Sequence, residues 1–271
     1  MRNAAIILLS MLSGAAIAQE SEVEQLARGP TRPAQVATLG PIQDGVVRAV
    51  KVVEGDRVKR GDLLLQLNDD VQEARIGLTR AAAASDGELR QAEVQAQEAE
   101  TVLGRTQAAA ARNAATEWEV RHARARLESA RAAVQAATDR RKVEQQRLEL
   151  EIATRETLMI RAPFDGIVTR LDTAAGATLS RTDRPIVVSD LSAIEAVLYL
   201  PGPLWPRLKL GNTYPLGLSA PVGGKRDGRL RYIEPVLDAA SGRFRAIFVI
   251  DNQDFALPAG VEATLDFSEV M

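Results

Sequence analysis

The feature that most constrains the fold of this chain is a β-type sequence that occurs twice, once on each side of a long helical segment. Residues 44–69 (DGVVRAVKVVEGDRVKRGDLLLQLND) align without a gap with residues 165–190 (DGIVTRLDTAAGATLSRTDRPIVVSD). The identical pairs are Asp44/Asp165, Gly45/Gly166, Val47/Val168, Gly55/Gly176, Arg60/Arg181, Asp62/Asp183 and Asp69/Asp190, and the conservative apolar pairs are Val46/Ile167, Val50/Leu171, Val58/Leu179 and Leu65/Ile186. Both copies therefore predict the same strand–turn–strand unit.

Four glycines, Gly45 and Gly55 in the first copy and Gly166 and Gly176 in the second, are predicted to mark the turns of these units. Glycine is expected there because it adopts backbone conformations that other residues avoid. Neither copy has enough strands to bury an apolar face alone. We therefore expect the two copies to pair, so that the intervening segment leaves and re-enters one β-domain at one place.

The intervening residues 71–158 contain no proline and have apolar residues at heptad spacing. In the second half the heptad positions are Val120, Leu127, Val134 and Leu148, with Arg141 at the skipped position, and Ala123, Ala130 and Ala137 form the complementary seam. This pattern predicts a coiled coil. Because both ends must rejoin one domain, we expect an antiparallel hairpin of two helices, Val71–Ala111 and Thr116–Leu158, each about 60 Å long.

The turn between these helices is predicted at Ala111–Ala115, immediately before a helix-start signal. Thr116 followed by Glu119 is a capping-box sequence, in which the Thr hydroxyl and the Glu carboxylate satisfy free N–H groups at a helix start.

Residues 191–271 change to short strands separated by Gly- and Pro-containing turns. Such spacing predicts a small β-barrel. We expect a strand at Gln35–Leu39 to complete the barrel, and we expect no membrane-proximal domain after it.

The N-terminus predicts export. Arg2 precedes an apolar run at Ala4–Leu12, and Ala16-Ile17-Ala18 is a small-x-small cleavage site. This combination is typical of a secretory signal peptide, cut here after Ala18. The chain has no cysteine, and therefore neither a disulfide nor a lipid-anchoring Cys is expected.

Composition argues against most chemistry. The chain has 34 basic and 36 acidic residues, so no basic field favours nucleic acid. One histidine and no cysteine exclude Ser/His/Asp, Cys/His and most zinc sites. No phosphate loop or dinucleotide motif is present. We therefore predict a non-enzymatic protein with no cofactor and no metal.

The two copies resemble the half-motifs of a lipoyl/biotinyl domain, and such a domain split by a helical hairpin resembles the periplasmic adaptors, or membrane fusion proteins (HlyD-like), of bacterial tripartite efflux pumps of the resistance–nodulation–division (RND) type. The stretches around Ser241-Gly242 and Leu257–Gly260 resemble the barrel of the same family. The implied fold is an elongated α+β multidomain chain, with a lipoyl-like β-sandwich split by a long antiparallel coiled-coil hairpin and followed by a small β-barrel. The expected parts are a signal peptide (1–18), an N-terminal segment with the first barrel strand (19–39), half-motif 1 (40–70), the hairpin (71–158), half-motif 2 (159–190) and the barrel (191–271).

The resemblance implies an adaptor in the periplasm, held at the inner membrane by an RND transporter, that forms a ring and meets a TolC-like outer-membrane channel. The family's tip motif of Arg, Leu and Ser corresponds here to Arg105, Ala109 and Thr116, with the leucine lost. The alternative is that these residues do not dock a channel. In that case Arg105 is an ordinary solvated arginine of the helix surface, and Thr116 serves only as a helix cap. Trp118 is either a contact residue or packs across the hairpin, and His122 is interpreted as a bystander.

There are three alternatives to the interpretation as an RND-type efflux adaptor. They are an adaptor for an ABC-type exporter, an exported coiled-coil scaffold without a transport role, and a lipoyl or biotin carrier. A carrier needs a lysine at the turn that joins the two half-motifs. Asn68-Asp69-Asp70 and the hairpin occupy that place, and the nearest lysine, Lys59, lies inside the half-motif. The carrier reading is therefore rejected.

Overall fold

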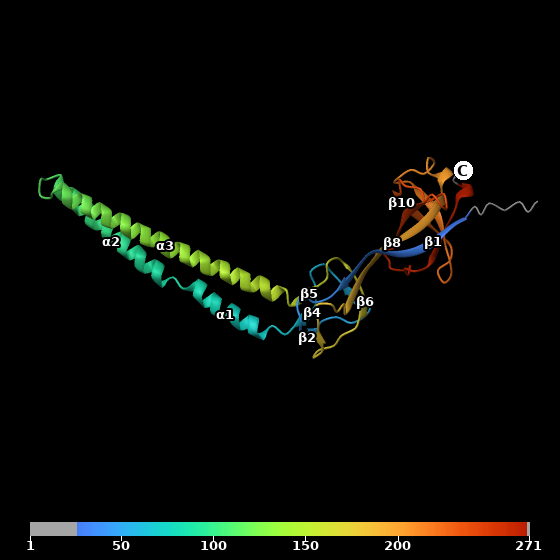
Figure 1. Cartoon of the computed structure of the whole chain (residues 1–271), viewed down its shortest axis with the longest axis horizontal. Coiled ribbons are helices and arrows are strands. Elements are labelled where there is room, and N and C mark those ends of the chain that lie inside the picture. Colours follow the sequence, from blue (N-terminus) through green and yellow to red (C-terminus); the bar gives the residue numbers. More distant parts are fainter. Residues whose placement is uncertain (1–25, 270–271) are drawn as a thin grey trace, which may run out of the picture. The chain divides into compact units, whose positions relative to one another are not determined.

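The structure, a computed structural model, describes residues 26–269 (Figure 1) and divides into two compact units. One unit is Gln35–Asp190, and the other joins the chain before residue 35 to the segment from Leu191 onward. The expected signal peptide at 1–18 lies outside the described residues. Within 26–269, no helix is both long enough and apolar enough to cross a membrane.

The β-domain of the first unit is built by strands exchanged between the two sequence copies. Its strands are β2 (Gly45–Val50), β3 (Arg57–Val58), β4 (Leu63–Leu67), β5 (Met159–Arg161), β6 (Gly166–Leu171), β7 (Thr178–Leu179) and the start of β8 (Ile186–Pro201). Strand β2 of the first copy pairs with β7 of the second, and β6 of the second copy pairs with β3 of the first. All of these pairs are antiparallel, and equivalent residues occupy equivalent registers. The predicted pairing of the two copies is confirmed.

The duplicated aspartates tie each copy to the other. Asp44 accepts a hydrogen bond from the backbone N–H of Arg181 at 2.8 Å, and its counterpart Asp165 accepts one from the N–H of Arg60 at 2.7 Å. Each contact therefore joins one copy to the other, in both directions. Because a lone copy would leave both the carboxylate and the N–H without this partner, the two copies depend on each other.

The core of the β-domain draws on both copies. Its fully buried members include Leu64, Leu65 and Leu67 from the first copy and Val168, Ile186 and Val188 from the second. Area burial of this kind stabilises by roughly 25 cal/mol per Å² of apolar surface. The apolar burial of this core is therefore complete only when the two copies meet.

The four glycines divide into two pairs with different roles. Gly55 and Gly176 are in turns with φ of +93° and +87°, a conformation that side chains disfavour. Gly45 and Gly166 differ from the turn expectation, because they open strands β2 and β6. At Gly166 a Cβ atom would lie 2.7 Å from the carbonyl oxygen of Ser189, so glycine there permits close strand packing.

The hairpin consists of α1 (Asp70–Ala84), α2 (Gly87–Ala110) and α3 (Glu117–Glu156), with α1 and α2 running alongside α3 (Figure 1). The expected single helix at Val71–Ala111 is wrong, because it breaks at Ser85–Asp86. Ser85 is extended with ψ of 119°, and α2 restarts where the carbonyl of Asp86 accepts from the N–H of Arg90 at 2.9 Å. Consecutive Ser, Asp and Gly all have weak helix propensity, and Ser and Asp favour caps, which explains the break.

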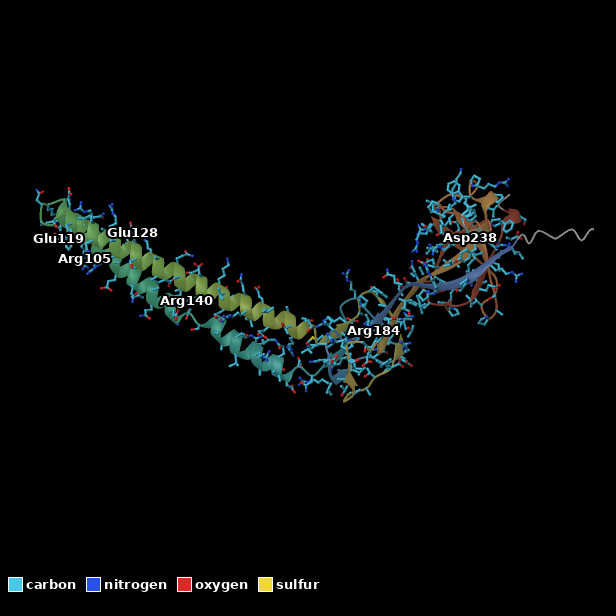
Figure 2. All side chains as sticks on the ribbon, in the orientation of Figure 1. Arg105, Glu119, Glu128, Arg140, Arg184 and Asp238 are labelled. Carbon is cyan, nitrogen blue, oxygen red and sulfur yellow. The ribbon has the colours of Figure 1, made fainter. Side chains whose placement is uncertain are left out.

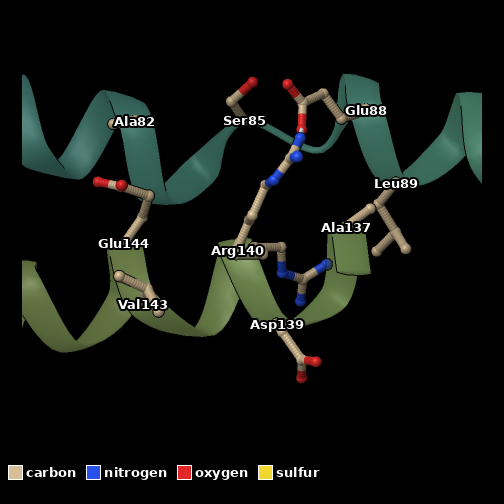
Figure 3. Close-up of a pocket in the computed structure, with 10 residues that line it drawn as sticks. Ala82, Ser85, Glu88, Leu89, Ala137, Asp139, Arg140, Val143 and Glu144 are labelled. Atoms are coloured by element: carbon tan, nitrogen blue, oxygen red, sulfur yellow. Dashed lines mark hydrogen bonds and ion pairs between the residues drawn. The ribbon is translucent and has the colours of Figure 1, made fainter. Parts of the chain in front are cut away.

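The break lies opposite the one irregularity in the heptad pattern of α3. A cavity of about 590 Å³ opens there, lined by residues that include Ser85 and Arg141, the residue at the skipped heptad position. Figure 3 shows Arg140 reaching across it toward Glu88, an ion pair of 3.0 Å. Both partners are strongly exposed, so this pair contributes at most about 1 kcal/mol.

A buried carboxylate ties the hairpin to the β-domain. Asp69, 1% exposed, lies between β4 and α1. Its Oδ1 accepts from Arg48 on β2 at 2.6 Å and from Gln66 at 2.9 Å, and its Oδ2 accepts from Arg155 at 2.6 Å. Burial by itself raises the pKa of Asp69, but the hydrogen bonds from Arg155 and Arg48 outweigh it and hold the pKa below its usual value. Because Arg155 is in the last turn of α3, one carboxylate joins both ends of the hairpin.

The second unit is a closed barrel with the strand order β1-β12-β9-β10-β11-β8, in which β8 pairs back with β1. The strands not yet bounded are β1 (Leu26–Leu39), β9 (Thr213–Leu218), β10 (Lys225–Ile233), β11 (Arg243–Asp251) and β12 (Glu262–Asp266). Phe244, Phe248 and Leu198 are buried in its core. The predicted barrel is therefore present. A buried carboxylate lies on its outer face: Glu195 alternates along β8 with the core residues Ile194 and Ala196, is 2% exposed and pairs with Arg32 and Arg231.

The expectation that Gln35–Leu39 completes the barrel is wrong. The residues that pair with β12 are Leu26–Pro30, opposite Asp266–Glu262, whereas Gln35 onward belongs to the other unit. The buried positions of this segment are Ala27, Gly29 and Thr31. These residues are too small and mixed to show an apolar alternation in sequence, and Gly29 is needed because a side chain there would overlap the carbonyl oxygen of Val197.

Two alanine substitutions at glycines are expected to act in opposite directions. Gly166→Ala should destabilise the β-domain by more than about 1 kcal/mol, since its Cβ would meet backbone. Gly77→Ala, inside α1 with open space around it, should stabilise the chain by up to about 1 kcal/mol through helix propensity. Thermal unfolding followed by circular dichroism checks both, and a stabilising Gly166→Ala would contradict the close-packing argument.

Removing the charge of Asp69 should weaken the hairpin root. Asp69→Asn is expected to lower the unfolding free energy by about 2 kcal/mol at neutral pH, because charged hydrogen bonds to two arginines are lost. The matched variant Glu88→Gln, which breaks an exposed pair, should cost less than about 1 kcal/mol.

The pH dependence of this effect follows from the lowered pKa of Asp69. The stabilisation is complete above the unfolded pKa of about 3.9 and is lost as pH falls through the lower folded pKa. The difference between wild type and Asp69→Asn should therefore shrink below about pH 4 in chemical denaturation. A difference that stays constant into strong acid would contradict the assignment.

Candidate functional site

The candidate site is the hairpin tip, residues 102–126, where α2 turns into α3. The turn is held by backbone hydrogen bonds from the N–H of Ala114 to the carbonyl of Ala109 at 2.9 Å and from the N–H of Asn113 to that of Ala110 at 2.9 Å. Asn113 adopts a positive φ of 59°, which asparagine tolerates better than most residues. The turn thus closes within a few residues and leaves both helix ends exposed.

Thr116 begins α3 through the predicted capping box, which is confirmed. Its Oγ1 accepts from the N–H of Glu119 at 3.2 Å, and the Glu119 carboxylate accepts from the N–H of Thr116 at 2.6 Å. The backbone hydrogen bond and then the side-chain hydrogen bond from Thr116 lower the pKa of Glu119. Thr116 therefore has a structural role, whether or not it also contacts a partner.

A groove of about 360 Å³ lies beside this turn, and we call it the tip groove. It is lined by Val102, Arg105, Thr106, Ala109, Ala115, Trp118, Glu119, His122, Ala123 and Arg126. The structure therefore brings Arg105 and Ala109 together on one surface, and Thr116 is next to it through its neighbour Ala115 and its capping partner Glu119. Figure 2 shows Arg105 and Glu119 at this end of the hairpin.

Two residues of the tip groove, Trp118 and His122, make a contact that the sequence did not predict. The side chain of Trp118 is 63% exposed, so it does not pack across the hairpin into a core. Its ring stacks on His122 with a centroid distance of 5.1 Å and an interplanar angle of 4°. His122, interpreted from sequence as a bystander, therefore fixes the orientation of Trp118. The i,i+4 spacing of the two residues was the available signal.

The tip groove has the composition of a contact surface. Over residues 26–269, no group of three or more His, Cys, Asp or Glu side chains is placed to hold a metal. An exposed aromatic ring beside arginines is the composition of protein–protein contact surfaces. The arrangement is suited to binding another protein.

Comparison with known proteins gives a consistent result. The model of the RND membrane fusion protein (MFP) family, barrel-sandwich hybrid domain, matches residues 35–190, which is more than half of the chain. Multidrug resistance protein MdtE of Escherichia coli K12 is 27% identical over 254 residues, covering 88% of this chain and 63% of MdtE. This chain therefore spans less than two thirds of the length of that relative.

Solved structures share the fold. MacA from Actinobacillus actinomycetemcomitans matches with a TM-score of 0.70 at 18% identity, over 89% of this chain and 77% of MacA. The membrane fusion protein Spr0693 from Streptococcus pneumoniae R6 matches with a TM-score of 0.55 at 15% identity, over 89% of this chain and 97% of Spr0693. At these identities the likeness concerns the fold alone.

Removing the N-cap hydroxyl should loosen the start of α3. Thr116→Ala is expected to speed the amide hydrogen exchange of Glu119, whose N–H donates to the Thr116 hydroxyl, about fivefold, which corresponds to a typical N-cap contribution. Thr116→Ser, which keeps the hydroxyl, serves as the control. Unchanged exchange in Thr116→Ala, measured by NMR or mass spectrometry, would contradict the role of the cap.

Proposed function

This chain is a member of the RND membrane fusion protein family, and from that membership we propose that it is the periplasmic adaptor of a tripartite efflux system. The adaptor joins an inner-membrane transporter to an outer-membrane channel and seals the conduit between them. The observation that carries the proposal is the family match across residues 35–190, which includes both sequence copies and the whole hairpin between them. The relative MdtE, named as a multidrug resistance protein, supports efflux as the process.

The hairpin supports a bridging role. Helix α3 is 40 residues long, which corresponds to about 60 Å. It contributes only Ala123, Leu127 and Ala137 as buried side chains, so it cannot serve as the core of a domain. Both ends of the hairpin meet at one buried carboxylate, Asp69, which lies before α1 and accepts from Arg155 of α3. A long arm anchored at one end and exposed at the other is suited to reaching a distant partner.

We assign the outer-membrane channel, of TolC-like type, to the hairpin tip. Arg105 and Ala109 line the tip groove, and Thr116 holds the adjacent helix start. These are the positions of the family's docking motif, with alanine in place of leucine. For the other end of the assembly we propose an RND transporter, in keeping with the family description. An ABC-type exporter is the alternative, as is a scaffold without a transport role.

Ring assembly is part of the proposal and is supported by apolar side chains exposed along the hairpin. Val71, Leu78, Val94 and Leu150 are between 65% and 74% exposed. Exposed apolar side chains that recur along an arm favour packing against a neighbouring copy. We also propose that the segment 1–18 directs export, which places the adaptor in the periplasm at the inner membrane.

Cells that lack the gene test this function directly. We expect them to retain more of a fluorescent dye substrate, and we expect the wild-type chain to restore export. A photo-crosslinking residue at Ala109 should then trap an outer-membrane channel, whereas one at the exposed shaft position Arg75 should not.

The outcomes separate the alternatives. Unchanged dye retention together with no crosslink to an outer-membrane protein would contradict the adaptor function and favour the scaffold. A chain-dependent complex with an ATPase-coupled permease would favour the ABC-type exporter over the RND transporter.

A further inference from the structure

We propose that Trp118, flanked by Arg105 and Arg126, is the anchor of the tip groove and that this groove selects an acidic α-helical segment of the outer-membrane channel. This inference rests on the proposed function and adds to it the chemistry of the partner. It assigns a principal role to Trp118, a residue outside the three-residue tip motif.

The first observation is that Trp118 is an ordered aromatic surface facing outward. It is the most exposed of the aromatic side chains among the exposed large hydrophobic residues, at 63%. The stack on His122 holds the ring, so little side-chain entropy is lost when a partner covers it. Tryptophan and arginine are the residues most enriched among the few that carry the energy of protein–protein interfaces.

The second observation is a set of arginines without partners. Residues 102–126 contain five arginines and two glutamates. Arg121 lies 3.9 Å from Glu117, but Arg105, Arg112, Arg124 and Arg126 make no ion pair or side-chain hydrogen bond with any described residue. Further down the hairpin, by contrast, Arg131 pairs with Glu100 at 2.9 Å. The tip therefore presents guanidinium groups whose complement is a carboxylate.

The third observation is the shape of the groove. Ala109, Ala115 and Ala123 contribute small side chains to the tip groove, and its volume of about 360 Å³ is open to solvent. A leucine at position 109 would project into this space, so alanine leaves it free beside Trp118. A groove between two helices accepts the side-chain ridge of a third helix. The occupant that fits is a helix with an apolar residue seated beside Trp118 and carboxylates facing Arg105 and Arg126.

The test measures how tightly variants of the chain bind the outer-membrane channel, which is the one identified by the photo-crosslinker at position 109. The full chain and the purified channel are titrated by microscale thermophoresis, for the wild type, Trp118→Ala, Trp118→Phe and the double variant Arg105→Glu/Arg126→Glu. Circular dichroism of each variant checks the fold, which the exposure of these side chains should leave intact. Controls of matched chemistry are Trp205→Ala in the barrel and Arg75→Glu on α1.

We expect Trp118→Ala to weaken binding at least about tenfold and Trp118→Phe to recover most of the loss. Wild-type binding should weaken when sodium chloride rises from about 0.05 to about 0.5 M, and the double variant should lose this salt dependence as well as affinity. The controls should bind as the wild type does. Unchanged affinity in Trp118→Ala, or wild-type binding whose affinity does not change with salt concentration, would overturn this inference but not the proposed function. Failure of the wild type to crosslink any channel would overturn the proposed function as well.

Discussion

The hydrogen-bonded cluster around Asp69 is the contact on which the arrangement of this chain depends. It joins β2, the start of α1 and the end of α3 through one buried carboxylate. The ion pairs along the hairpin are exposed and worth little individually, and few side chains between its helices are buried. The direction of the arm therefore depends more on its root than on its shaft. A hairpin that transmits contact between two partners needs such a fixed root.

The β-domain explains why the root is where it is. Its two halves exchange strands and reciprocal aspartate contacts, so neither half is complete alone. The turn that would join the halves of a continuous domain is replaced by the hairpin, which leaves after β4 and returns at β5. Asp69 and Asp190 occupy the same position of the two copies, and Asp69 is the one that accepts from Arg48 and Arg155 at the hairpin root.

Much of this fold could be predicted from sequence because its main elements have strong local sequence signals. The pairing of the duplicated copies, the existence of a helical hairpin between them and the Thr116/Glu119 capping box were predicted correctly. The features that could not be predicted have a common cause, because the residues that determine them have weak sequence signals. The barrel strand that pairs with β12 at Leu26–Pro30 buries small residues, so its sequence shows no apolar alternation. The weak helix formers Ser85–Gly87 interrupt a segment whose sequence is otherwise typical of one continuous helix. The stacking of Trp118 on His122 depends on side-chain conformation, which spacing permits but does not specify.

The central claim is that the chain is an adaptor that meets the outer-membrane channel at its hairpin tip. The most direct measurement is a cryo-electron microscopy map of the chain assembled with its channel and transporter. The account predicts channel density against the tip groove, in contact with Trp118 and Arg105, and transporter density elsewhere on the chain. A map in which the tip is free, or in which the channel contacts only the barrel unit, would contradict it.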